Sequence, residues 1–367
     1  MPGLYIHIPF CIQKCSYCDF ISFPNSEEYH AKYIDMLAHE MEGYKGSKID
    51  TVFIGGGTPT ILKNVLLEKL CRKIKENFVL TDDCEFTVEA NPKTLNGEKL
   101  KTLKNGGVNR LSIGVQSFND DELSVLGRIH NAEDAYNTVC MAKNMGFENI
   151  NVDLMSALPS QTYDKLKFTL EKAVSLEPTH ISCYSLILED GTLLEKKYSS
   201  GKITVPNEDD DRKMYSMVCE YLAECGYEQY EISNFAKKGY ECRHNIKYWE
   251  CNEYIGLGVA AHSYMNKVRF YNTNSLKEYL DGNMRSGETV LTDKDLIEEF
   301  MIMGFRMTRG IAKSEFERRF NMSIDDVYGD ILDKHIKNGF IIYDSGYYKL
   351  SKKGIDVSNS VLCDFIF

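Results

Sequence analysis

The segment Cys11-Ile-Gln-Lys-Cys15-Ser-Tyr-Cys18 is the part of the chain on which the rest of the sequence analysis depends. It directly follows a short apolar run at residues 4–10, which is typical of a buried strand. Three thiols on one loop, within eight residues, can converge on one metal centre. A structural zinc site and a common [4Fe–4S] site normally take four protein ligands. Three cysteines around a cubane cluster would leave one iron open, and an open iron can hold a substrate or cofactor.

Two simpler interpretations of the three cysteines remain open at this point. They are reduced thiols without a ligand, or they belong to a zinc site that His7 or His30 completes. The C-x3-C-x2-C spacing is not one of the usual zinc pairs. It resembles instead the loop of the radical S-adenosylmethionine (SAM) superfamily, including the aromatic Tyr17 before the third cysteine. The resemblance implies that the open iron binds SAM, whose reductive cleavage yields a radical.

The composition favours a compact, acidic, intracellular protein. The 367 residues are 43% hydrophobic and carry a formal net charge of −11, so a nucleic-acid partner is not expected. We find no signal-peptide pattern and no apolar segment long enough to span a membrane. The 12 cysteines then fit reduced thiols and metal ligation better than disulfides. We expect a cytoplasmic protein.

Short apolar segments alternate with helical patterns along the first half of the chain. We expect strands at residues 4–8, 51–54, 85–89, 110–115, 150–154 and 180–186. Such alternation predicts parallel strands joined by right-handed crossovers, either in a doubly wound sheet or in a β/α barrel. The radical SAM resemblance selects between them and implies an α/β fold with an open, partial (β/α)6 TIM-like barrel.

We expect three parts in the chain. They are the barrel at 1–235, a connecting segment at 236–290, and a module at 291–367 whose helices and hairpin resemble a winged helix. Residues 290–367 contain 11 Lys and Arg against 13 Asp and Glu, which is the wrong sign for binding phosphates. We therefore interpret the last part as a structural lid or docking module.

Polar residues and glycines fall at the carboxyl ends of the expected strands, where α/β proteins place their sites. They are Gly55-Gly-Gly-Thr58 after the second strand, Glu89 after the third, Gln116 after the fourth and Asp153 near the end of the fifth. The glycines permit close approach of the backbone to a ligand. Arg128 has the fork geometry that pairs with a carboxylate, although it is equally a surface arginine. Together these residues predict one polar ring around the cluster.

The stretch His244-Asn-Ile-Lys-Tyr-Trp249 contains the only tryptophan of the chain. One interpretation is a packed aromatic corner with a hydrogen-bonded histidine. The other is a flat apolar surface whose imidazole ligates haem iron, with Arg243 and Lys247 near the propionates. A second metal site at Cys242 and Cys251 is a further alternative.

Several motifs together resemble one family, the HemW-type radical SAM haem chaperones, which are relatives of the oxygen-independent coproporphyrinogen III oxidases. The motifs are Tyr5-Ile-His-Ile-Pro-Phe-Cys11, Gly55-Gly-Gly-Thr-Pro-Thr60, Glu89-Ala-Asn-Pro92, Ser112-Ile-Gly-Val-Gln-Ser-Phe118, Leu126-Gly-Arg-Ile-His130 and His244-Asn-Ile-Lys-Tyr-Trp249. The likeness covers nearly the whole chain. It implies a protein that binds a [4Fe–4S] cluster, SAM and haem, and that exchanges haem with donor and acceptor proteins, including respiratory membrane proteins.

The resemblance assigns each site residue by its position in a motif. Cys11, Cys15 and Cys18 would hold the cluster, and His244 would ligate haem. The residues implied around SAM are Tyr5, Tyr17, Gly56, Gly57, Thr58, Glu89, Gln116, Arg128, Asp153, Ile187 and His262. An electron donor for the cluster is implied if SAM is cleaved.

At two positions this chain departs from the sequences that it resembles. The oxidases carry a further cysteine where this chain has Phe20, which argues against oxidative decarboxylation of coproporphyrinogen III. The loop after Asp153 has Ala157 where the family usually has a glycine, which affects the expected loop geometry. The oxidase activity and a radical SAM enzyme that modifies haem remain the alternatives to a chaperone.

The cysteine loop generates a first prediction. Anaerobic reconstitution should give about four iron atoms per chain, because that is the stoichiometry of a cubane. Cys15→Ala should lose the iron and the brown absorbance, since each thiolate binds a different iron. Iron content and the visible spectrum check this. A variant without all three cysteines that retains full iron would show that the cluster lies elsewhere.

Overall fold

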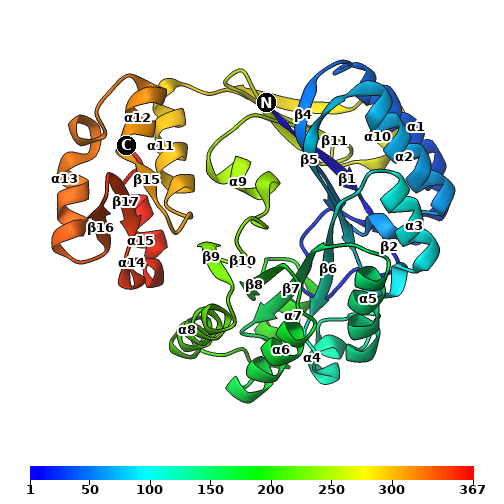
Figure 1. Cartoon of the computed structure of the whole chain (residues 1–367), viewed down its shortest axis with the longest axis horizontal. Coiled ribbons are helices and arrows are strands. Elements are labelled where there is room, and N and C mark those ends of the chain that lie inside the picture. The colour runs from blue at the N-terminus through cyan, green and yellow to red at the C-terminus, as the bar shows by residue number, and fades with distance from the viewer.

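The structure is a computed structural model that describes the whole chain, residues 1–367. Its centre is a single twisted sheet of 12 strands, which curves around an open interior (Figure 1). From one edge to the other the strands are β14 (Arg285–Val290), β13 (Val268–Asn272), β12 (His262–Met265), β11 (Tyr254–Leu257), β1 (Gly3–Ile8), β4 (Lys48–Gly56), β5 (Val79–Ala90), β6 (Arg110–Gln116), β7 (Asn149–Ser156), β8 (His180–Ser185), β10 (Asn234–Ala236) and β9 (Glu228–Glu231).

The six strands from β1 to β8 in this order pair in parallel, as the alternating sequence predicts. Helices connect them and cover the outer, convex face of the sheet (Figure 1). These are α1 (His30–Glu42), α2 (Asn64–Asn77), α3 (Gly97–Asn105), α4 (Asp120–Val125), α5 (Ala132–Asn144), α6 (Tyr163–Ser175), α7 (Leu193–Ser199) and α8 (Glu208–Glu224). The apolar stripes of α1, α2, α3, α5, α6 and α8 and the outward side chains of the strands form one continuous core. The predicted α/β fold with a partial, TIM-like barrel is confirmed.

Short elements complete this part of the chain. They are β2 (Phe10–Cys11), β3 (Phe23–Pro24), the 3-10 turns η1 (Glu27–Tyr29), η2 (Pro59–Ile61) and η3 (Pro92–Thr94), and the helices α9 (Arg243–Trp249) and α10 (Leu276–Leu280). None of the helices is long and apolar enough to cross a membrane.

The segment 236–290 takes part in the sheet rather than merely connecting two parts. β11 pairs in parallel with β1, placing Tyr254 opposite Gly3, and β12, β13 and β14 follow as an antiparallel meander. On the opposite edge, β10 and β9 are antiparallel to β8. Both additions cover strand edges of the parallel core that would otherwise leave backbone groups unpaired. That the three predicted parts, with boundaries after residues 235 and 290, fold as separate units remains a prediction.

The last part of the chain forms a compact module beside the sheet (Figure 1). It contains α11 (Asp293–Gly304), α12 (Lys313–Phe320), α13 (Ile324–Lys337), α14 (Lys352–Asp356) and α15 (Ser358–Cys363), with β15 (Ile311–Ala312), β17 (Tyr347–Leu350) and β16 (Ile341–Asp344) in one small sheet. Phe300, Phe316 and Phe365 lie in a core of its own. Three helices followed by a hairpin give the winged-helix-like arrangement that the sequence predicts.

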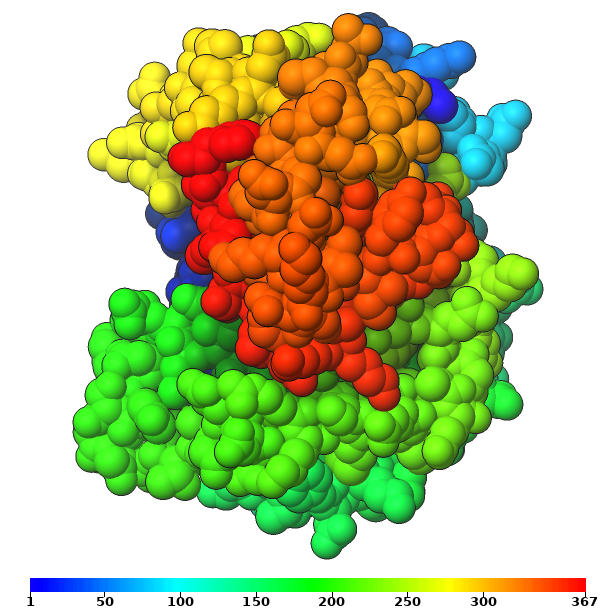
Figure 2. Space-filling model, turned by 90° about the vertical axis from the view of Figure 1, so that its left-hand side faces the viewer, coloured from blue at the N-terminus to red at the C-terminus, as the bar shows by residue number.

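This C-terminal module contacts both edges of the large sheet. Met307 forms a bridge with Glu231 of β9, and the Thr308 backbone N–H donates to the Tyr230 carbonyl at 3.1 Å. At the other edge, Arg269 of β13 pairs with Glu299 of α11 at 3.0 Å. Figure 2 shows the module, in orange and red, lying across the molecule between the yellow and the green segments. It therefore links the two ends of an open sheet.

Candidate functional site

The cysteine loop extends from the carboxyl end of β1, as expected. Backbone hydrogen bonds fix it on two sides: the Ser16 N–H donates to the Leu126 carbonyl at 2.9 Å, and the Leu194 N–H donates to the Ser16 carbonyl at 2.7 Å. Cys11, Cys15 and Cys18 are all half-buried and free of disulfides. The loop thus presents three reduced thiols from a backbone that neighbouring loops hold in place.

The three thiols lie close enough to influence one another electrostatically. Burial raises the pKa of Cys18 to about 11, and the nearby Cys15 and Cys11 add to the rise. Yet no three His, Cys, Asp or Glu side chains surround one ion position. Both ring nitrogens of His7 are engaged, with the Tyr5 hydroxyl and the Ile21 carbonyl, each at 3.0 Å. A cubane binds each thiol at a different iron, so its ligands need not share one coordination shell.

His30 also lies away from a metal position. It is 4% exposed and packs against the Phe10 ring at 4.2 Å between centroids. The imidazole thereby helps to bury the apolar ring of Phe10. The zinc interpretation through His7 or His30 therefore has no support in the geometry.

The glycine turn after β4 lies directly beside the cysteine loop. The Gly57 N–H donates to the Ile8 carbonyl at 2.9 Å, and the Thr58 N–H donates to the Phe10 carbonyl at 2.8 Å. A Cβ atom at Gly57 would lie 2.7 Å from the Phe10 carbonyl oxygen, so only glycine fits. Gly56 has φ of +105°, which also requires glycine. Thr58 Oγ1 lies 3.7 Å from Cys11 Sγ, which brings the turn against the first thiol.

Two carboxyl groups face the same interior from β5 and β7, the strands on either side of β6. Glu89 accepts a hydrogen bond from the Gly56 N–H at 3.0 Å, and Asp153 accepts from Ser112 Oγ at 2.9 Å and Asn151 Nδ2 at 2.8 Å. Burial, followed by the nearby Asp153, raises the pKa of Glu89 to about 8. Burial also raises the pKa of Asp153. Both carboxyls are therefore poised to gain from a cationic or hydrogen-bond-donating ligand.

Arg128 lies between the cysteine loop and β6. Its Nη1 contacts Cys15 Sγ at 3.4 Å, and its Nη2 donates to the Gly114 carbonyl at 2.6 Å. Its Nε is buried and has no hydrogen-bond partner. Gln116, at φ +70°, turns its side chain toward the same point, because a Cβ at Gly114 would meet both Gln116 Nε2 and Arg128 Nη2 within 3.2 Å. An unpaired guanidinium nitrogen beside the thiols suits a ligand carboxylate.

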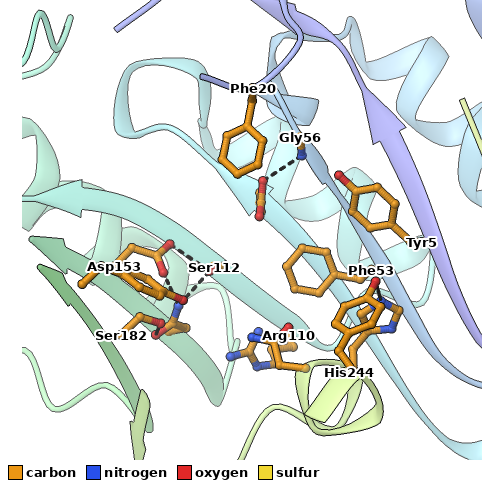
Figure 3. A pocket seen from close by; sticks show the side chains of 14 residues that line it. Tyr5, Phe20, Phe53, Gly56, Arg110, Ser112, Asp153, Ser182 and His244 are labelled. Carbon is orange, nitrogen blue, oxygen red and sulfur yellow. Dashed lines mark hydrogen bonds between the residues drawn. The ribbon is translucent and has the colours of Figure 1, made fainter. Parts of the chain in front are cut away.

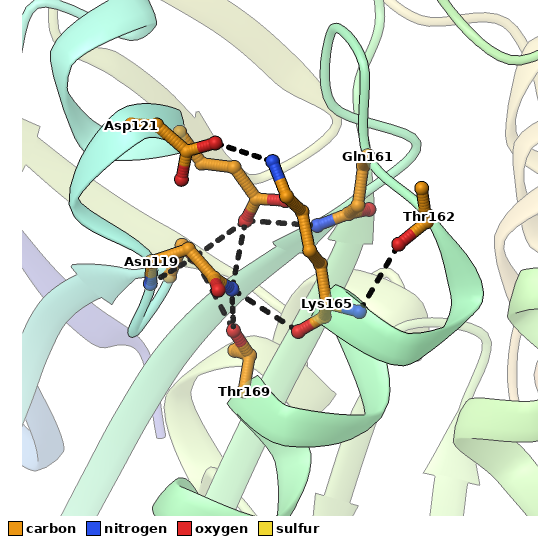
Figure 4. Close-up of polar contacts among 8 residues, drawn as sticks. Asn119, Asp121, Gln161, Thr162, Lys165 and Thr169 are labelled. Carbon is orange, nitrogen blue, oxygen red and sulfur yellow. Dashed lines mark hydrogen bonds and ion pairs between the residues drawn. The ribbon is translucent and has the colours of Figure 1, made fainter.

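A buried polar network fixes the segment that carries Gln116 and Arg128 (Figure 4). Glu122 is 2% exposed and accepts hydrogen bonds from Ser117 Oγ at 2.5 Å and Gln161 Nε2 at 3.3 Å. Asn119 Nδ2 donates to Thr169 Oγ1 at 3.0 Å and to the Lys165 carbonyl at 3.1 Å. The segment is thereby tied to α6, which gives Arg128 a defined position.

The interior of the barrel contains a cavity of about 330 Å³ below the glycine turn (Figure 3). It is lined by Tyr5, Phe20, Phe53, Gly56, Glu89, Arg110, Ser112, Asn151, Asp153, Ser182, Tyr184, His244, Asn245 and Tyr248. Of these, Tyr5, Gly56, Glu89, Asp153 and His244 are predicted site residues. The sequence predicts no site role for Arg110, Ser112, Asn151 and Ser182. Alternation along the strands could have indicated one, because residues 110 and 112, and residues 151 and 153, share the inner face of a strand.

His244 lies in the wall of this cavity, in the packed aromatic corner that was one of its two interpretations. It is 1% exposed and stacks on Phe53 at 5.3 Å between ring centroids. Its Nδ1 lies 2.9 Å from Thr51 Oγ1 and its Nε2 lies 2.9 Å from the Tyr248 hydroxyl. Burial, with the nearby Lys247 and Arg110, lowers the pKa of His244 to about 3, so the ring is neutral.

Some predicted residues lie apart from the cavity. His262 is exposed and lines a second groove with Tyr5, Phe20 and Tyr248 at the mouth of the barrel. Ile187 is 69% exposed beyond the end of β8. Tyr17 packs with Leu126 and its neighbours in a small apolar cluster under the cysteine loop.

Two further sequence features have a clear structural outcome. Ala157 has φ of +55°, so the loop keeps the backbone conformation that the usual glycine would adopt. Cys242 is fully buried at the start of α9 and its Sγ lies 3.6 Å from Glu85 Oε1, whereas Cys251 follows the C-terminal end of that helix. No group of metal-ligating side chains forms around them.

Comparison with known proteins identifies relatives along the whole chain. A model of the radical SAM superfamily matches residues 5–173, and one of the HemN C-terminal domain matches residues 291–357. "Heme chaperone HemW" of Lactococcus lactis is 38% identical over 365 residues, covering 99% of this chain and 96% of the relative. The protein of the same name from Bacillus subtilis is 38% identical, covering 100% and 99%.

A solved structure agrees with the fold. Coproporphyrinogen III oxidase (HemN) from Escherichia coli, described as a radical SAM enzyme, superposes with a TM-score of 0.86 over 100% of this chain and 90% of its own. Its sequence identity is 24%, so the likeness establishes the fold alone.

The buried carboxyl of Glu89 generates a second prediction. Its folded pKa, near 8, lies above the unfolded value of about 4.3, so stability falls as the pH rises between these values. Glu89→Gln removes this dependence. From pH 6 to pH 8 the ligand-free variant should gain about 2 kcal/mol over the wild type, and the gap should level off above pH 8. Urea denaturation at each pH measures it, with the exposed Glu133→Gln as control. A gap that does not change with pH would contradict the assignment.

Proposed function

Because the chain belongs to the radical SAM superfamily and to the family of proteins named heme chaperone HemW, we propose that it is a haem chaperone. In this proposal it binds a [4Fe–4S] cluster, SAM and haem, and delivers haem to acceptor proteins. The observation that carries it is local: three free thiols, a glycine turn, two buried carboxyls and an unpaired guanidinium nitrogen meet at the mouth of one barrel.

Different residues at the mouth of the barrel would bind the cluster and the parts of SAM. Cys11, Cys15 and Cys18 would hold the cluster, which supplies an open iron and an electron. The buried Nε of Arg128 would pair with the carboxylate of SAM, and Glu89 would accept from its ammonium or ribose. The backbone turn at Gly56, Gly57 and Thr58, with Tyr5, Tyr17, Gln116 and Asp153, would enclose the rest of the cofactor. Ile187 and His262 would contribute from the rim.

The assignment of Arg128 gives a third prediction. Arg128→Ala should weaken SAM binding by about ten- to a hundredfold, because a hydrogen bond to a charged group contributes about 1.5–3 kcal/mol. Iron content must be measured in the same sample, since Arg128 also touches Cys15. Isothermal titration of the reconstituted protein checks the affinity, and Arg72→Ala, on the exposed side of α2, is the control. Unchanged SAM affinity at full iron content would remove Arg128 from the site.

For haem, we propose His244 as the ligand. Its neutral imidazole is the form that binds iron. A histidine ligand commonly donates its second N–H to a neighbouring acceptor, and Thr51 Oγ1 occupies that place at Nδ1. Nε2 is held by the Tyr248 hydroxyl, so ligation exchanges one hydrogen bond for a bond to iron.

The partners follow from the same proposal. They are a haem donor and haem-accepting proteins, including respiratory membrane proteins, and an electron donor if SAM is cleaved. The acidic charge of the chain, −11, gives no basis for nucleic-acid binding. A cytoplasmic location suits a cluster that requires a reducing environment.

The fourth prediction tests haem binding. Titration with haem should give a Soret band typical of nitrogen ligation, and His244→Ala should weaken or reshape it. Tyr248→Phe should bind haem at least as tightly as the wild type, because it frees Nε2. His39→Ala is the matched control, since its side chain is 70% exposed. A wild-type spectrum and affinity in His244→Ala would assign the iron to another ligand.

The enzyme alternatives need a direct assay. Phe20, at the position where the oxidases carry a cysteine, is 60% exposed at the mouth of the cavity. Reconstituted protein is incubated with coproporphyrinogen III, SAM and a reductant. Formation of protoporphyrinogen would establish the oxidase, and consumption of haem with an altered product would establish a haem-modifying enzyme. Transfer of intact haem to membranes from haem-depleted cells, without either product, supports the chaperone.

A further inference from the structure

Arg110 is a buried charge without a partner. It is the first residue of β6 and is 1% exposed, yet its guanidinium makes no hydrogen bond or ion pair with the protein. Its Nε is fully buried and unpaired. Burial disfavours the charged guanidinium, but attraction by nearby groups, Cys242 and Glu85 foremost, compensates for it and raises the pKa of Arg110. What remains unused is its hydrogen-bonding capacity, and buried polar groups in folded proteins usually have hydrogen-bond partners.

The guanidinium of Arg110 faces the cavity inside the barrel. β6 enters the barrel at Arg110 and leaves it at Gln116, so Arg110 lies at the end of the interior opposite the cysteine loop. Figure 3 shows its guanidinium at the bottom of the cavity, between the Asp153 and Ser182 side and His244. The cavity of about 330 Å³ extends from there to Gly56 and Phe20.

The neighbouring polar groups are already engaged with one another. Ser112 and Asn151 donate to Asp153, and Ser182 donates to Asn234 Oδ1 at 2.7 Å. Glu85 of β5 accepts the backbone N–H groups of Arg243 and His244 at 3.0 Å each. These carboxylates lower the electrostatic cost of Arg110 at a distance, but none of them pairs with it. The hydrogen-bonding capacity of the guanidinium is therefore left for the contents of the cavity.

We propose that the cavity binds a carboxylate-bearing ligand and that Arg110 is the residue that pairs with this carboxylate. The fork of an arginine matches a carboxylate with two parallel hydrogen bonds. The cavity is at the lower end of the volumes of small-molecule sites, so it accommodates one acidic arm or a small organic acid. The carboxylate is thus either a propionate of the proposed haem or that of a free small acid. Only the first source rests on the proposed function.

The test compares wild type with Arg110→Met, which keeps the length of the side chain and removes the charge. Three probes are used with the reconstituted full chain: hemin, hemin dimethyl ester, whose propionates are blocked, and propionate itself. If a haem propionate is the ligand, Arg110→Met weakens hemin binding by about ten- to a hundredfold and leaves the ester unchanged. If a small acid is the ligand, propionate gives a saturation-transfer NMR signal with wild type that Arg110→Met loses. Arg212→Met, on the exposed side of α8, is the control.

Two outcomes overturn the proposal. If wild type and Arg110→Met bind hemin and its ester with equal affinity and give the same propionate signal, only water in the cavity solvates the guanidinium. A thermal unfolding temperature well below that of wild type in both Arg110→Met and Arg110→Lys means that the residue is structural. A moderate loss of stability in Arg110→Met alone is expected, because this variant also removes the attraction between the guanidinium and the nearby Glu85 and Asp153. If wild type binds no hemin at all, the haem proposal fails, and the propionate arm still decides the role of Arg110.

Discussion

The site depends on the parallel pairing of β1 with β4. This register sets Ile8 opposite Gly56, so the cysteine loop and the glycine turn leave the sheet at the same level and side by side. The carbonyls of Ile8 and Phe10 then accept the N–H groups of Gly57 and Thr58. A shift of one residue would turn every side chain of β1 to the other face of the sheet and separate the two loops. The thiols are therefore placed by strand pairing, before any metal is bound.

The second constraint is the burial of ionisable groups inside the barrel. Glu89 and Asp153 near the mouth have raised pKa values, while Arg110 at the opposite end retains its charge without a partner. A folded chain tolerates such groups because the network around Asn151 and Ser112 satisfies their neighbours. Buried ionisable groups lower the stability of the empty protein, and they favour binding of a ligand with donor groups at one end and an acid at the other. At these positions the chain has lower folding stability and higher affinity for such a ligand.

The sequence predicts the local features of this site and misses those that depend on distant contacts. The cysteine loop, the glycine turn and the strand-end residues Glu89 and Asp153 follow from short motifs and from the ends of apolar runs. The pairing of β11 with β1 does not, because it joins residues from opposite ends of the chain and no short pattern encodes it. Arg110 was interpreted as a strand residue, since nothing local reveals that its partner is absent. The packing of His30 against Phe10 likewise joins two elements that no single helical or strand pattern relates.

The C-terminal module connects the two edges of the open sheet and also reaches the proposed haem ligand. α9 is fixed at its start by Glu85, which accepts the N–H groups of Arg243 and His244. It ends at Trp249, whose ring lies 4.4 Å from the Arg306 guanidinium, and Arg306 in turn pairs with the buried Glu231 of β9 at 3.5 Å. A short helix held at both ends moves as a unit. Any displacement of α9 that separates His244 Nδ1 from Thr51 Oγ1 of β4 therefore also shifts Trp249 against the module. Occupation of the interior and the position of the module are mechanically linked through one helix of seven residues.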